Sequence, residues 1–90
     1  MRKETIKKLR AVCTRIEAIV NEVQNIQSDV DFEASMEHEK AYNLEEKFPD
    51  KADIFNEIAE SLDDAVSELD EAANCLESAS NNIAEACEPI

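Results

Sequence analysis

Residues 55–90 read FNEIAESLDDAVSELDEAANCLESASNNIAEACEPI and repeat one apolar pattern without interruption. Large apolar residues recur every seven positions, at Phe55, Leu62, Leu69, Leu76, Ile83 and Ile90. Small or medium apolar residues stand between them, at Ile58, Ala65, Ala72, Ala79 and Ala86. Alternating steps of three and four residues are the heptad pattern of a coiled coil. The alanines predict that a partner helix packs closely against this seam.

The composition predicts an all-α protein with very few loops. The chain has 90 residues, which allow one domain at most. It contains no glycine, which is the residue that makes tight turns at low cost, and its only prolines are Pro49 and Pro89. Residues that favour helices, such as alanine, glutamate and leucine, dominate instead.

The first part of the chain has a matching apolar pattern, and we expect a helix from about residue 3 to residue 43. Its predicted seam consists of Ile6, Leu9, Cys13, Ile16, Val20, Val23, Gln27, Val30, Ala34, Glu37, Ala41, Leu44 and Phe48. A further apolar column of Val12, Ile19 and Ile26 lies beside this seam. The stripe narrows after Val30, so the two helices should match well away from the turn and less well near it.

The break between the helices is expected at residues 44–50, because Pro49 disfavours helical geometry in the residue before it. Asp50 is the predicted N-cap of a second helix over residues 51–87. So short a link makes the helices antiparallel neighbours, with residue numbers across the hairpin totalling about 95. This register places Cys13 opposite residue 82, and it places Phe48 and Phe55 at the end of the core.

A two-helix hairpin buries only one stripe on each helix, and domains of this size are marginally stable. The column of Val12, Ile19 and Ile26 therefore needs cover, as does a second column of Ala59, Val66 and Ala73. We expect two hairpins to pair into a four-helix bundle, which makes the protein a homodimer. The alternative is that a different protein covers the exposed columns.

The net charge of −13 argues against direct binding to nucleic acid or to anionic membranes, both of which repel acidic surfaces. Six lysines and arginines lie in the first fifteen residues, whereas residues 52–90 hold eleven acidic residues and no lysine or arginine. This asymmetry either sets the orientation of the chain in an assembly or reflects pairing within the hairpin with Glu85 and Glu88.

No cluster in the sequence indicates a metal, a cofactor or an enzyme. His38 is the only histidine, and Ser35 stands where a helical di-iron site needs glutamate. Asp29, Asp31 and Glu33 alternate like the start of a calcium loop, but the required glycine is missing. The three cysteines, Cys13, Cys75 and Cys87, are expected to be free thiols, which fits a cytoplasmic protein.

The second helix carries a dense acidic stretch, and the members expected to contact a partner are Glu57, Glu60, Asp63, Asp64 and Glu68. With Asp70 and Glu71, seven charges occupy about 21 Å of helix, or one per ~3 Å, which is close to the ~3.4 Å spacing of phosphates along one DNA strand. The stretch could therefore imitate nucleic acid and block a basic groove on a host protein. The simpler interpretation is an ordinary solvated face.

Phe32 and Met36 form a second candidate contact patch, because both are apolar and both fall outside the predicted seam. The alternative is an exposed pair without a role.

The stretch Ala41-Tyr42-Asn43-Leu44, the break at Pro49 and the leucine and alanine steps through Ala72 carry a resemblance. They resemble small, acidic coiled-coil hairpin proteins of phages and mobile elements of Gram-positive bacteria. In that group proline usually follows the asparagine and leucine directly, whereas here Glu45 follows and the proline comes at Pro49, so we expect a different turn. The resemblance implies a hairpin and a mobile-element origin, but no activity. We therefore expect a non-enzymatic protein-protein interaction module, with the acidic inhibitor as the alternative.

Overall fold

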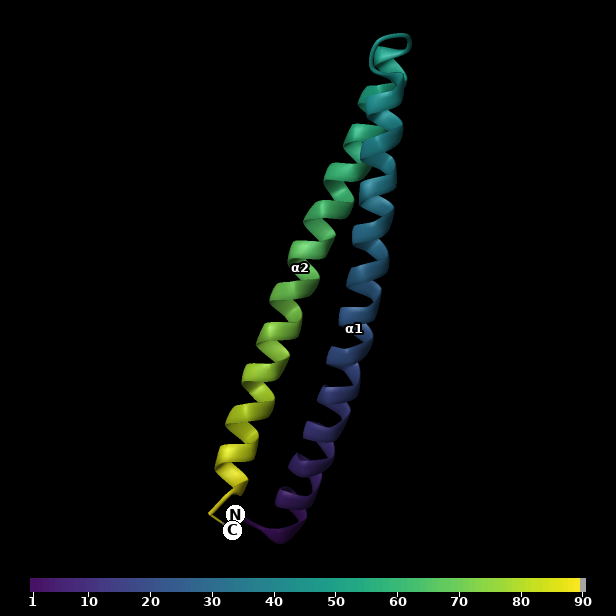
Figure 1. The fold of residues 1–90 in the computed structure, drawn as a ribbon. Coiled ribbons are helices and arrows are strands. Elements are labelled where there is room, and N and C mark those ends of the chain that lie inside the picture. Colours follow the sequence, from purple (N-terminus) through teal and green to yellow (C-terminus); the bar gives the residue numbers. More distant parts are fainter. Residues whose placement is uncertain (90) are drawn as a thin grey trace.

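The computed structural model describes residues 1–89 and consists of two long α-helices that run antiparallel, side by side (Figure 1). Helix α1 spans Lys3–Leu44 and α2 spans Pro49–Cys87, within two residues of the predicted bounds. The two termini lie together at one end, and the turn lies at the other. The protein is an all-α helical hairpin. Ile90, the last predicted seam residue, lies outside the described residues.

The turn, residues 45–48, is built without left-handed backbone, and no residue in the range 1–89 has a positive φ. The Phe48 N–H donates to the Leu44 carbonyl at 2.8 Å, which carries the chain round after α1 ends. Phe48 then has an extended φ of −137°, and Pro49 begins α2 at the position where a missing N–H costs least. The predicted cap at Asp50 is wrong, because this residue already lies in the first turn of the helix, where its charge favours the helix dipole.

The predicted seam of α1 is confirmed from Ile6 to Leu44, since every one of its residues is buried or half-buried. Phe48 is the exception. It was expected to close the end of the core, but it is 50% exposed because it lies in the turn, where the ammonium of Lys51 stands 5.2 Å from its ring.

The predicted seam of α2 is half wrong. The large column of Phe55, Leu62, Leu69, Leu76 and Ile83 does face α1. The smaller residues beside it in the interface are Ala52, Ala59, Val66, Ala73, Ser80 and Cys87, and not the column that begins at Ile58. Ala59 is fully buried, whereas its neighbour Ile58 is 43% exposed. Both columns keep the three-four spacing with the leucines, so spacing alone could not separate them.

Two hydrogen bonds across the interface define its register. The Gln27 side-chain amide donates to the Val66 carbonyl at 3.2 Å, and the Cys13 thiol lies 3.6 Å from the Ser80 carbonyl. Residue numbers across the hairpin therefore total 93 along this part, two fewer than predicted. Cys13 is opposite Ser80 instead of residue 82.

Alanine lines the interface in the half near the turn. Ala34, Ala41, Ala52 and Ala59 are all buried, and they are half of the eight buried residues of the core. Because alanine fills little space, its complete burial requires a close approach of the two helices. The expected poorer match near the turn is therefore not seen in the burial of these residues.

The hairpin is a thin rod. It measures 67 × 14 × 14 Å, and its radius of gyration is 20.0 Å, against about 12 Å for a compact domain of this length. Its accessible surface is 6904 Å², against about 5300 Å² for a compact protein of the same mass. No described helix combines the length and apolar character needed to cross a bilayer.

Candidate interaction surfaces

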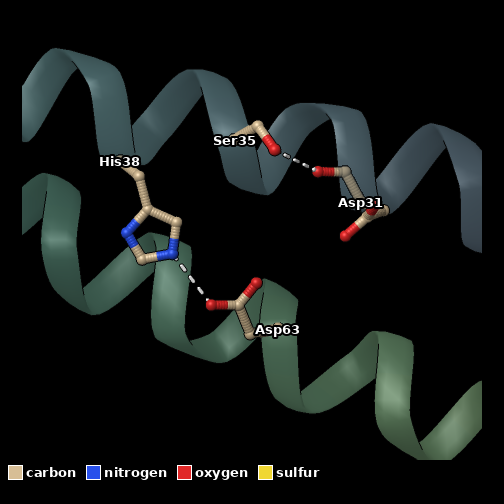
Figure 2. A network of polar contacts seen from close by, with 4 residues as sticks. All are labelled: Asp31, Ser35, His38 and Asp63. Atoms are coloured by element: carbon tan, nitrogen blue, oxygen red, sulfur yellow. Dashed lines mark hydrogen bonds and ion pairs between the residues drawn. The ribbon is translucent and has the colours of Figure 1, made fainter.

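The two long sides of the hairpin can be distinguished by one contact between the helices. His38 of α1 and Asp63 of α2 approach to 2.8 Å, from imidazole Nε2 to carboxylate Oδ2 (Figure 2). Asp63 directly follows Leu62 of the large column of α2, and His38 directly follows Glu37 of the matching α1 column of Leu9, Ile16, Val23, Val30, Glu37 and Leu44. Residues that follow the large column therefore share one side of the hairpin in both helices. The other seam column begins at Ile6 in α1 and at Ala52 in α2, and residues that directly precede its members share the opposite side.

We call this opposite side the apolar flank, because its central part consists almost entirely of aliphatic residues. Its apolar members are Val12, Ile19 and Ile26 of α1 and Ile58, Ala65, Ala72, Ala79 and Ala86 of α2, and towards its ends the same side carries Thr5, Glu33, Lys40 and Lys51. The four large members, Val12, Ile19, Ile26 and Ile58, have exposed fractions of 39%, 45%, 53% and 43%. Helices that merely face solvent carry polar residues at such positions, so the apolar flank departs from the pattern of an ordinary solvent-facing surface.

The side that bears His38 has the opposite character, and we call it the polar flank. Its members are Arg10, Glu17, Gln24, Asp31, His38, Asn56, Asp63, Asp70, Glu77 and Ala84. The imidazole of His38 and the carboxylate of Asp63 keep exposed fractions near one half, so their contact contributes little to stability. Ser35, beside them in Figure 2, donates its hydroxyl to the Asp31 carbonyl within α1 at 3.2 Å. The two long sides of the hairpin thus differ, one being polar and the other largely apolar.

Glu37 is the one charged residue of the interface near the turn. Its side chain is only 14% exposed. The Oε1 atom accepts a hydrogen bond from the Lys40 ammonium at 3.0 Å, while the buried Oε2 atom has no partner among the described residues. The same ammonium lies 5.6 Å from the centre of the Phe55 ring, which is within reach of a cation–π interaction. Lys40 thus compensates the buried carboxylate in part.

The structure places Phe32 and Met36 on the exposed surface of α1, one helical turn apart, with exposed fractions of 64% and 38%. Phe32 is on the outermost line of the helix and does not belong to the apolar flank. Tyr42 and Ile54 are also exposed, and the sequence pattern had not singled out either as a contact residue.

The five acidic residues predicted as a contact surface, Glu57, Glu60, Asp63, Asp64 and Glu68, are all exposed. They do not form a single line. Asp63 belongs to the polar flank and contacts His38, whereas Glu68 lies next to the apolar flank. The acidic surface therefore wraps round the outside of α2.

The remaining candidates from the sequence are metal-binding groups and the three cysteines. Within residues 1–89, no three His, Cys, Asp or Glu side chains are grouped so that they could hold a metal ion. Cys13 is half-buried, Cys75 is exposed and Cys87 is buried, and all three are free thiols.

The pair His38 and Asp63 was not predicted from the sequence, because either register total, 95 or 93, places His38 opposite residue 57 or 55 and not opposite Asp63. The usable signal was that each residue follows a large seam residue, which places both on the same side of an antiparallel pair.

Comparisons of the chain with family models, with curated proteins and with solved structures find no match.

Proposed function

We propose that the protein is a non-enzymatic interaction module whose hairpin associates with a second copy through the apolar flank, forming a four-helix bundle. The observation that carries the proposal is the apolar flank itself. It places four half-exposed aliphatic side chains and four alanines on one side of a rod whose other side is polar. A second copy is the partner that offers a self-complementary surface of the same kind.

The surface available for such an interface is large enough. The chain exposes about 1600 Å² more than a compact protein of its mass, and a standard interface buries about 800 Å² on each partner. Covering the exposed half of one valine or isoleucine contributes about 1 kcal/mol. Eight such side chains in a dimer give about 8 kcal/mol, to be set against an association cost of 4–15 kcal/mol. At the lowest cost these eight side chains alone leave about 4 kcal/mol, a dissociation constant of about 1 mM, and burial of the alanines of the apolar flank lowers the expected constant towards the micromolar range.

The test is sedimentation equilibrium of the full chain and of two matched variants, Ile19→Asp and Phe32→Asp. Both changes put a carboxylate in place of an exposed apolar side chain of α1, but only Ile19 lies on the apolar flank. Ile19→Asp occurs twice in a dimer, where it removes about 2 kcal/mol of burial and buries two carboxylates, so the dissociation constant should rise at least a hundredfold.

Phe32→Asp should leave the dissociation constant within about threefold of the unchanged protein. A folded chain that stays monomeric at several hundred micromolar would refute self-association. Loss of association in Phe32→Asp alone would move the interface to the patch formed by Phe32 and Met36.

A second candidate function is inhibition of a basic, nucleic-acid-binding host protein through the acidic outside of α2. The exposure of Glu57, Glu60, Asp64 and Glu68 supports it, together with the excess of acidic residues over the whole chain. Capture of a basic protein should then be lost in a variant carrying Asp63→Lys, Asp64→Lys and Glu68→Lys that retains its helicity. It should also weaken as the salt concentration rises. Capture that the three changes leave intact would exclude this function.

A further inference from the structure

The charged side chains of the hairpin are unevenly distributed along its length. The open end, residues 1–15 and 78–89, holds six basic and three acidic side chains. The turn end, residues 29–64, holds thirteen acidic and three basic side chains. Because the two termini lie at one end of the rod and the turn at the other, these charges are separated along the 67 Å axis (Figure 1). One end of the molecule is therefore mildly positive and the other strongly negative.

The apolar flank is symmetric about its own centre. On α1, Val12 and Ile26 stand seven residues to either side of Ile19. On α2, Ala65 and Ala79 stand seven residues to either side of Ala72. The register of the hairpin places Ala72 within about 3 Å of the level of Ile19 along the axis, given 1.5 Å per residue. A twofold axis through this level would superimpose both columns on themselves.

We propose that two hairpins pair in antiparallel orientation across the apolar flank, with a twofold axis at the level of Ile19 and their turns at opposite ends. This inference rests on the proposed self-association and specifies its geometry. In this arrangement α1 packs antiparallel to α1 of the second copy, and α2 packs antiparallel to α2. Ile19 meets its own copy, and Val12 of each chain meets Ile26 of the other.

Charge decides between this arrangement and the other twofold pairing, in which both turns lie at the same end. The same-end pairing places the isoleucines of α1 against the alanines of α2, which is acceptable packing. It also brings two strongly acidic turn ends together, thirteen carboxylates from each copy. Antiparallel pairing instead sets each basic open end alongside the acidic residues of the other copy, for example Lys8 at the level of Asp31. Opposite charges placed at the same level favour this orientation and disfavour the other.

Disulfide trapping in single-cysteine variants tests the geometry. The background carries Cys13→Ala, Cys75→Ser and Cys87→Ala, and its helicity and association are first shown to match those of the unchanged chain. Val12→Cys, Ile19→Cys and Ile26→Cys are then introduced one at a time. Each is oxidised alone, and Val12→Cys is also oxidised as an equal mixture with Ile26→Cys. The two partners of that mixture differ in mass, so the linked species can be identified by mass spectrometry.

The expected result is that Ile19→Cys links to itself, and that Val12→Cys and Ile26→Cys link to each other at least tenfold faster than either links to itself. Positions 12 and 26 are 14 residues, or about 21 Å, apart along the helix. A disulfide needs Cα atoms within about 7 Å, so each variant should find a partner at only one level.

The failures are distinguishable. An equal mixture of Val12→Cys with Ala79→Cys that links efficiently would establish the same-end pairing and overturn the proposed orientation. A protein that dimerises, yet in which Ile19→Cys does not link and positions 12 and 26 do not pair, would overturn the proposed axis. A chain that sediments as a monomer would refute the proposed self-association itself.

Discussion

Ala72 and Ala73 are adjacent alanines whose environments differ completely, and a carboxylate placed at each tests which column of α2 faces α1. Ala73 is only 3% exposed in the helix interface, whereas Ala72 is exposed on the apolar flank. Ala73→Asp should bury a carboxylate without a partner, at a cost of about 3–5 kcal/mol. Ala72→Asp should cost the isolated hairpin only the difference in helix propensity, about 0.7 kcal/mol.

These costs are large relative to the stability of so thin a rod. A 90-residue domain has about 5–13 kcal/mol of unfolding free energy in total, so Ala73→Asp should remove a large part of it. Urea unfolding followed by circular dichroism at about 1 μM, below the expected dissociation constant, measures the hairpin without contributions from association.

In sedimentation, which measures self-association, the variant with the larger effect should be Ala72→Asp. Ala72→Asp should weaken self-association while its urea midpoint at low concentration stays nearly unchanged. An Ala72→Asp variant that unfolds more easily than Ala73→Asp would refute the burial pattern on which the apolar flank is defined.

Two further predictions concern the interface and the thiols. Replacing Glu37 by leucine removes a buried carboxylate oxygen that has no partner, so the free energy of unfolding should rise by about 1–2 kcal/mol in urea titrations; a loss of stability would show that the contact with Lys40 is net favourable. A thiol-specific reagent should modify the exposed Cys75 first, Cys13 more slowly and the buried Cys87 last, as followed by mass spectrometry of digests; equal rates would contradict the described packing.

Much of this architecture was accessible from periodicity. The seam of α1 from Ile6 to Leu44 could be predicted residue by residue, because the competing column of Val12, Ile19 and Ile26 continues with the charged Glu33 and Lys40. Pro49 indicated the break, because a proline tolerates the first turn of a helix and disfavours helical geometry in the residue before it.

The seam of α2 could not be resolved in the same way. Ile58 and Ala59 both stand at allowed steps from Phe55 and Leu62, and both belong to apolar columns. The apolar content of the two columns does not decide which one faces the partner helix. That choice depends on how α2 is rotated about its own axis when it packs against α1, which is a property of the pair and not of one helix.

The contact between His38 and Asp63 was not predicted for a different reason, because the pattern places both residues on one side of the hairpin but does not pair them. The sequence gives the average register of the backbones, but long side chains at the edge of an interface reach past the nearest residue of the neighbouring helix. Their partners depend on rotamers, which leave no mark in a heptad pattern.

The alanine-lined interface near the turn also bears on how the hairpin forms. Ala41 and Ala52 meet after closing a loop of about ten residues, whereas Ile6 and Cys87 meet only when nearly the whole chain has been brought together. The entropy of loop closure grows with loop length, and local contacts form fastest. We infer that the two helices zip together from the turn and open from the termini, and amide hydrogen exchange should accordingly be fastest at the open end. The negatively charged end of the molecule is then the first part to acquire its structure and the last to lose it.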